Sequence, residues 1–234
     1  MTQNAESSSL RKKTILSLGL LVPAPSIGLL CGMVFFPDTV LGKTIFTISK
    51  IWLFGLPAIW YLFIERGKLS VSVPRKGGFG LGVLSGLAIS AAILLAYLLV
   101  GQLFLDKGAI RDKVHAIGLD SIGVYAAGAA YWILVNSVLE EYVWRWFVVK
   151  QCSRLFRPLT AILLSAFFFT VHHTFGLKTL MPWPATWVCS FGVFTGGALW
   201  SWLYVKYESI WPGYVSHAIV DLCIFGIGAV IAFG

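Results

Sequence analysis

Long apolar runs constrain this chain more than any other feature. They recur from near the N-terminus to the C-terminus, and most extend for about 20 residues, long enough for a helix to cross a hydrocarbon core of roughly 30 Å. Only 12% of the 234 residues are charged and 58% are hydrophobic, whereas roughly a quarter of a soluble domain is charged. The sequence therefore predicts an all-α polytopic membrane protein that forms one transmembrane helical bundle.

Seven spans account for the apolar runs. We expect a polar N-terminal tail over residues 1–13 and a single transmembrane domain over residues 14–234. Pro23 and Pro25 are expected to kink the first span. An eighth span would arise if residues 136–150 broke away from the preceding helix. The predicted spans cover about residues 14–36, 44–64, 79–105, 121–149, 159–176, 185–204 and 211–233.

The formal net charge of +8 reflects topology rather than a nucleic-acid partner. The basic residues are spread over short loops, and no basic stripe alternates with aromatic residues. More of them fall on the side of the N-terminus, which predicts that the N-terminus is cytoplasmic. The basic residues counted on the opposite side are Lys43, Lys50, Lys107, Arg111, Lys113 and Lys178. Residues 106–120 are expected to form a polar loop.

Three glycines open the third predicted span at four-residue spacing: Gly78, Gly82 and Gly86. Residues four apart share one face of a helix, and a face made of glycine allows a second helix to approach closely. The spacing favours packing within the chain over dimerisation. The four cysteines, in contrast, are isolated and show none of the spacings typical of a zinc or disulfide framework.

Two adjacent carboxylates and an arginine lie near the end of the fourth predicted span, in the segment Glu140–Glu141–Tyr142–Val143–Trp144–Arg145. A charged side chain in hydrocarbon is costly, so such residues are candidates for a functional site and are expected to pair with another polar or charged group. Glu141 and Arg145 are four residues apart and share a helix face, which predicts an ion pair. Glu140 is rotated by about 100° and remains available for another role.

Two further spans carry ionisable groups. The fifth contains His172 and His173, and the last contains His217 and Asp221 four residues apart. Taken alone, a histidine in an apolar helix is usually a core residue bonded to a neighbouring carbonyl or hydroxyl group. Because three spans carry such groups, we expect them to converge on one another.

A convergent set of this kind has a definite chemistry. A glutamate can act as general base on a water molecule, a histidine can share the proton, and a second histidine with its aspartate can stabilise an oxyanion. The same atoms could bind a divalent metal, because Glu140, His173 and His217 resemble the ligands of hydrolytic zinc sites. No serine or cysteine lies in a recognisable nucleophile motif, so attack by water is preferred.

The motifs themselves resemble those of a known family. Glu140 to Arg145 fits EExxxR, Phe169 to His173 fits FxxxH with Ser165 four residues earlier, and His217 to Asp221 fits HxxxN/D. In this order, over about residues 120–230, they are similar to the motifs of the CPBP intramembrane proteases. That family includes the type II CAAX prenyl endopeptidases and bacterial Abi proteins.

The resemblance implies a role for each matched residue. Glu140 would activate the hydrolytic water with His173, His217 and Asp221 would lie on the oxyanion side, and Glu141 with Arg145 would be structural. His172 also follows a phenylalanine by four residues, so it is an alternative for the second motif. Asp221 departs from the asparagine usual in prenyl endopeptidases, and an ionised aspartate cannot donate a hydrogen bond.

The function expected on this basis is an intramembrane endopeptidase. Its partners would be membrane lipid and a peptide or protein substrate at the membrane, prenylated or not, in CAAX-type or bacteriocin-type processing. The alternatives are a catalytically silent membrane scaffold of the same fold and a proton-coupled transporter. No inverted repeat supports transport.

Overall fold

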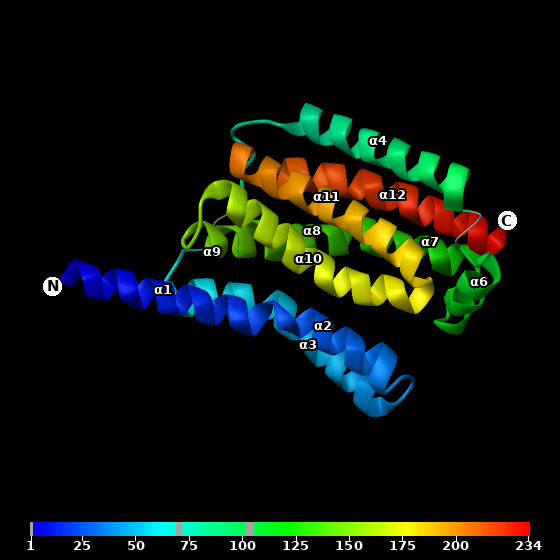
Figure 1. Ribbon diagram of the computed structural model, residues 1–234, viewed down its shortest axis with the longest axis horizontal. Helices are drawn as coiled ribbons and strands as arrows, with labels where there is room; N and C mark the ends of the chain where they lie inside the picture. Colours follow the sequence, from blue (N-terminus) through cyan, green and yellow to red (C-terminus); the bar gives the residue numbers. More distant parts are fainter. Residues whose placement is uncertain (1, 69–71, 102–104) are drawn as a thin grey trace.

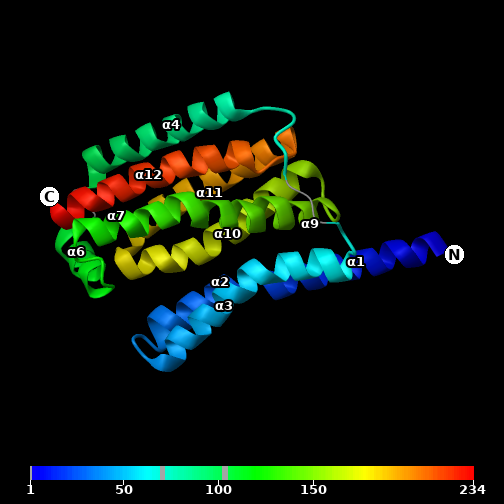
Figure 2. The ribbon, with the colours of Figure 1, turned by 180° about the vertical axis from the view of Figure 1, so that it is seen from behind.

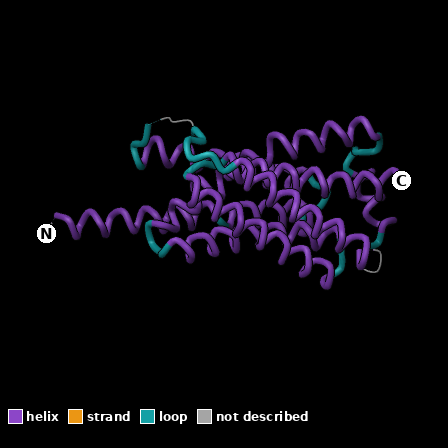
Figure 3. The backbone as a smooth tube through the Cα atoms, turned by 90° about the horizontal axis from the view of Figure 1, so that it is seen from above, coloured by secondary structure: helices purple, strands orange, loops and turns teal. Residues whose placement is uncertain are grey.

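The computed structural model describes residues 2–68, 72–101 and 105–234 as a bundle of long helices, and no strand occurs among them (Figures 1 and 3). Seven helices in this part of the chain are long and apolar enough to cross a membrane. These spans are Ser8–Phe35, Val40–Ile64, Phe79–Gly101, Ile122–Ser153, Pro158–Leu180, Trp183–Tyr207 and Trp211–Phe233. The all-α fold and the count of seven are confirmed. Ile122–Ser153 is continuous, so residues 136–150 form no eighth span.

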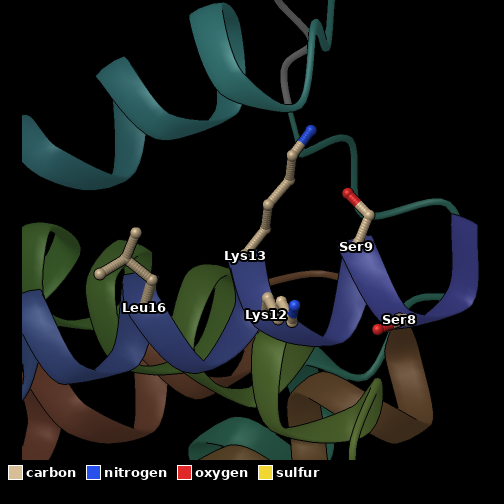
Figure 4. Close-up of a pocket in the computed structure, with 5 residues that line it drawn as sticks. All are labelled: Ser8, Ser9, Lys12, Lys13 and Leu16. Atoms are coloured by element: carbon tan, nitrogen blue, oxygen red, sulfur yellow. The ribbon is translucent and has the colours of Figure 1, made fainter. Parts of the chain in front are cut away.

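The first two spans form a hairpin on one side of the bundle (Figures 1 and 2). α1 (Thr2–Leu21) runs through the polar tail and ends one residue before α2 (Pro23–Leu30), so the first span is interrupted at the predicted prolines. α3 (Val40–Ile59) returns beside α2 and continues to Ile64 as a π-helical turn. The N-terminal part of α1 projects beyond the other helices, and its polar residues line an open hollow (Figure 4).

α4 (Phe79–Ala96) packs along α12 (Trp211–Phe233) on the opposite side of the molecule (Figure 1). The glycine face predicted from the sequence makes this contact. A Cβ atom at Gly86 would lie 2.9 Å from the carbonyl oxygen of Ser216, and one at Gly82 would meet the carbonyl oxygen of Pro212. Gly78 adopts φ +94° against the ring of Tyr207. Packing within the chain is therefore confirmed for these glycines.

The predicted loop between the third and fourth spans contains a helix instead. α6 (Lys107–Ala116) begins with Asp106, whose side chain accepts a hydrogen bond from the amide of Ala109. The Arg111 side chain donates to the carbonyl oxygens of Ile231 and Gly234, at 3.2 Å each from Nη2. These carbonyls end α12 and have no partner within the helix, so α6 caps the end of the bundle. The loop predicted over residues 106–120 is therefore wrong, because a short helix rich in polar residues carries no long apolar run.

The fourth span is assembled from α-helical and π-helical turns in sequence. α7 (Ile122–Tyr131) is followed by a π-helical turn over Trp132–Asn136, by α8 (Ser137–Glu141), by a π-helical segment over Tyr142–Val149 and by α9 (Lys150–Ser153). π-Helical turns are rare and occur frequently at functional sites. Here two of them flank the helical turn that carries both carboxylates.

α10 (Pro158–Leu180) and α11 (Trp183–Tyr207) complete the bundle and pack against each other along their length. Ser165 on α10 donates a 2.7 Å hydrogen bond to the carbonyl oxygen of Trp144, which fixes α10 against the fourth span. The buried core lies between these elements and is built largely from aromatic and aliphatic residues, among them Trp144, Phe147, Phe169 and Trp200. The charged residues of the motifs lie against this core.

Candidate active site

Glu140 lies at the centre of a cluster of ionisable side chains from α8, α10 and α12. It is only 7% exposed, and its Oε1 accepts a 2.9 Å hydrogen bond from Nδ2 of Asn136 one helical turn earlier. Its Oε2 lies 3.8 Å from Nε2 of His217. Ligand atoms of Glu140, His172 and His173 all lie within 4.8 Å of one another. The predicted convergence of three spans is therefore present.

His173 is held in one tautomer by its own helix. Nδ1 lies 2.8 Å from the carbonyl oxygen of Phe169, and a carbonyl can only accept, so Nδ1 carries the proton. In the neutral ring Nε2 is then an acceptor. This nitrogen is available to take a proton from water, which is the chemistry that the sequence predicts for His173.

His172 also reaches the cluster. Its ring stacks on Trp144 with centroids 5.3 Å apart and an interplanar angle of 11°, and its side chain is buried. The ring centroids of His172 and His173 lie 4.2 Å apart. Both candidates for the second motif are thus near Glu140, and the choice of His173 as the catalytic one stays a prediction.

His217 bonds to a different carboxylate from the one expected. Its Nδ1 lies 3.0 Å from Oε1 of Glu141, while its Nε2 lies 3.7 Å from Oδ2 of Asp221. That aspartate oxygen instead accepts a 2.6 Å hydrogen bond from Oγ of Ser137. An ionised Glu141 has no hydrogen to donate and can only accept a hydrogen bond, so Nδ1 of His217 carries the proton. Nε2 then faces Glu140 and Asp221.

Glu141 and Arg145 form the predicted ion pair inside the core. Arg145 Nε lies 3.5 Å from Glu141 Oε1, and both side chains are fully buried. The guanidinium also lies over the rings of Phe169 and Trp200, at 4.6 and 5.1 Å from their centroids. A buried charge is tolerated when it is paired in this way. Glu141 therefore links the ion pair to His217.

The structure partly supports the predicted metal ligands. Glu140 and His173 belong to the cluster of potential ligands, but the third member is His172, whereas His217 was expected. A carboxylate and two imidazoles suit Zn²⁺, whose ligand atoms lie about 2.0–2.2 Å from the ion.

Four further residues near the motif residues were not predicted to belong to the candidate site. Asn136 precedes Glu140 by four residues, so helical spacing could have indicated it. Lys50 was counted with the basic residues of the outer side, although it lies within the predicted span 44–64 and within the observed span Val40–Ile64. Ser137, which bonds Asp221, and Trp200, which stacks on His217 at 3.9 Å, carry no signal in the sequence because their contacts join distant segments.

A cavity of about 460 Å³ lies beside the fourth span, among α3, the π-helical segment Tyr142–Val149 and the end of α11. Tyr61, Tyr142, Trp146 and Tyr204 line it together with Arg75 and Glu208. None of the motif carboxylates or histidines is among its lining residues.

Comparison with known families gives one match. Residues 123–223 match the model described as type II CAAX prenyl endopeptidase Rce1-like. The matched segment contains every motif position from Glu140 to Asp221, so the resemblance to the CAAX-type intramembrane proteases is confirmed. Neither a curated protein nor a solved structure matches the chain.

Proposed function

We propose that this protein is an intramembrane endopeptidase that hydrolyses a peptide bond with a water activated by Glu140 and His173. The observation that carries the proposal is the buried Glu140 carboxylate, fixed by Asn136 and facing imidazoles from two other helices. A general base must be held within reach of the proton that it removes. The match of residues 123–223 to a CAAX endopeptidase family supports the same reaction.

The reaction follows from the hydrogen-bonding state of each side chain. A water between Glu140 and His173 gives a proton to the carboxylate or to Nε2 of His173, and its oxygen attacks the scissile carbonyl carbon. The carbonyl oxygen becomes an oxyanion. When the C–N bond breaks, the proton returns to the departing amine nitrogen. The other proton of the water stays on the new carboxylic acid and passes to the amine, so the products are a carboxylate and an ammonium group and the side chains regain their initial state.

His217 is suited to the oxyanion side. Its Nδ1 is occupied by Glu141, so Nε2 is the nitrogen that faces the reacting atoms. When Nε2 carries a proton, it can donate to the developing negative charge. Asp221 would position this ring, because its oxygen accepts from Ser137 and lies 3.7 Å from Nε2.

A metal is an alternative means of activating the water. Glu140, His172 and His173 would hold a divalent ion, which would polarise the water as a Lewis acid. The side chains above can perform each proton transfer themselves. Because these side chains suffice for the proton transfers, we propose that the protein acts without a metal.

The substrate would be a peptide segment at the membrane, and the N-terminus of the protein would lie in the cytoplasm. The family match is to prenyl endopeptidases, so a prenylated peptide is the first candidate and a non-lipidated peptide is the second. A silent scaffold would show no cleavage of either. A transporter would show pH-dependent flux in liposomes without a peptide.

The test uses the full chain in liposomes with fluorogenic peptides, each made with and without a farnesyl group. Cleavage should be abolished in Glu140→Gln and His173→Ala and unchanged in His115→Ala. His115 is a matched control because it is an exposed histidine on α6, outside the cluster. Circular dichroism should show that all three variants fold. Full activity in both Glu140→Gln and His173→Ala would refute the assignment.

A further inference from the structure

Lys50 lies well inside the second span and has no role in the reaction above. It belongs to α3, and its Nζ lies 5.8 and 5.7 Å from the ring centroids of Phe46 and Phe54, one turn before and one turn after it. A lysine within a span is costly and by default marks a functional site. A Lys near a helix end can extend to the lipid headgroups. Lys50, at about 15 Å along the helix from Val40, is too far from that end.

The level of Lys50 in the bundle matches that of Glu140. Glu65, just beyond the end of the second span, accepts hydrogen bonds of 2.6 and 2.8 Å from Arg154, just beyond the end of the fourth span. Starting from this shared end, Lys50 lies about 22 Å along its helix and Glu140 about 21 Å along its own, at roughly 1.5 Å per residue. The two side chains therefore occur at the same depth.

The helix that carries Lys50 lies beside the candidate active site. α3 packs against the π-helical segment Tyr142–Val149, which begins directly after Glu140 and Glu141, and Lys50 itself is half-buried. Among the described residues, no carboxylate lies within 4.0 Å of Lys50 Nζ. Lys50 is thus at the level of Glu140, on a helix that packs beside the motif segment, and has no carboxylate partner in the part of the chain that the structure describes.

Catalysis alone does not explain this cation. A positive charge beside a general base favours the ionised carboxylate and so weakens the base. A substrate anion is a better explanation. A carboxylate entering a site that already contains Glu140 and Asp221 would be repelled by both, and one lysine offsets this repulsion. The phenylalanine rings beside the lysine supply an apolar surface for the chain that bears the carboxylate.

We propose that Lys50 binds a carboxylate of the peptide substrate and selects peptides that place this group near the scissile bond. The inference rests on the proposed peptidase function. The carboxylate could be a free C-terminus or the side chain of an aspartate or glutamate, and the two sources share the same ion-pair chemistry. Binding by Lys50 orients the peptide; it does not take part in proton transfer.

The experiment compares peptides that differ in one group. The first ends in a free carboxylate, the second is its C-terminal amide, and the third has each acidic side chain replaced by its amide. Binding is measured by fluorescence anisotropy with Glu140→Gln protein, which does not depend on cleavage. Lys50→Met should raise the Kd for the carboxylate-bearing peptide by about tenfold or more, because charge-assisted hydrogen bonds contribute about 1.5–3 kcal/mol.

The control variant is Lys43→Met, because Lys43 lies on the same helix, seven residues earlier, and is exposed. It should bind all peptides as before. Lys50→Arg should retain most of the preference, which shows that the charge matters. Of the two amidated peptides, the one whose Kd no longer changes with Lys50→Met identifies the carboxylate that Lys50 binds. In the active protein, Lys50→Met should raise KM and leave kcat nearly unchanged.

Two results would overturn the inference. One is an equal change in Kd for all three peptides, and the other is no change for any peptide. If Lys50→Met does not fold, Lys50→Gln and Lys50→Arg decide the question by the same comparison. If no peptide is cleaved by the unsubstituted protein, the proposed function fails. The binding preference measured with Glu140→Gln protein still tests Lys50 separately.

Discussion

His217 is hydrogen-bonded to Glu141: Nδ1 of the imidazole lies 3.0 Å from Oε1 of the carboxylate, on a helix 76 positions earlier in the chain. The same oxygen lies 3.5 Å from Nε of Arg145. One buried carboxylate thus serves both the ion pair and the candidate oxyanion residue. The second glutamate of the motif therefore contacts His217 as well as Arg145.

Glu141→Gln should destabilise the protein because Arg145 would remain buried without its counter-ion. Breaking a buried pair by removing one partner costs about 3–5 kcal/mol. Thermal unfolding in detergent should show a lower midpoint. The double variant Glu141→Gln/Arg145→Met should recover part of the loss, because it removes both charges. A midpoint unchanged in Glu141→Gln would contradict this account.

Asp221→Asn should fold and retain cleavage. The side-chain carbonyl of asparagine still accepts the hydrogen bond of Ser137, and its amide adds a donor beside Nε2 of His217. Asp221→Leu should lose at least tenfold in kcat/KM, since it has neither group. Steady-state cleavage rates provide the comparison. Loss of activity in Asp221→Asn would show that a negative charge is required.

Chelation should leave cleavage unchanged. We expect EDTA or 1,10-phenanthroline to have no effect on the rate, because in the proposed reaction the side chains themselves supply the proton transfers. Metal analysis of the purified protein should give well under one ion per chain. Inactivation by chelator and recovery with Zn²⁺ would instead establish the metal-dependent alternative.

Glu65 should make the stability depend on pH. Burial raises its pKa, but the hydrogen bonds from Arg154 and Gln151 and the charge of Arg154 outweigh burial and hold the pKa below its ordinary value of 4.5. The pKa of Glu65 is lower in the folded protein than in the unfolded chain. The stabilisation by ionised Glu65 is therefore present above pH 4.5 and is lost as the pH falls through the pKa of the folded protein. At pH 7 the free energy of unfolding should be about 1 kcal/mol higher for the unsubstituted protein than for Glu65→Gln. The difference should shrink below pH 4.5; a constant difference would contradict the assignment.

Gly82→Ala should weaken the packing of α4 on α12. The added methyl group would meet the backbone carbonyl of Pro212, which cannot move aside, and overpacking of this kind costs about 1–3 kcal/mol. Gly80→Ala is the matched control, since no atom lies within 4 Å of a Cβ there. Thermal unfolding should show a lower midpoint for Gly82→Ala alone. Equal midpoints for the two variants would argue against close packing at Gly82.

The sequence was sufficient for features that depend on one helix. Apolar length predicts seven spans, the spacing of Glu141 and Arg145 predicts their ion pair, and the glycine spacing predicts a close helix contact. Each follows from the period of the α-helix and the cost of charge in hydrocarbon. The convergence of the motif residues also follows, because ionisable groups in spans pair with one another.

Features that depend on how helices meet were not predictable in the same way. The choice of Glu141 as partner for His217 requires the relative rotation of α8 and α12, which hydropathy does not contain. The bond between Ser137 and Asp221 joins residues 84 positions apart. Lys50 was counted on the outer side, although the predicted span 44–64 contains it, because a single charge near the start of an apolar run resembles a flank. Its depth is evident only once the bond between Glu65 and Arg154 aligns the two helices.

The indole of Trp200 lies parallel to the imidazole of His217, with centroids 3.9 Å apart and an angle of 16° between the planes. One side of the imidazole is therefore screened, and a substrate can come near only at the opposite side or at the ring edge. Because a stacked ring resists being turned out of its plane, the indole also limits the directions in which Nε2 of His217 can point. An aromatic residue that exchanges no proton thereby keeps the imidazole aimed at the other motif residues.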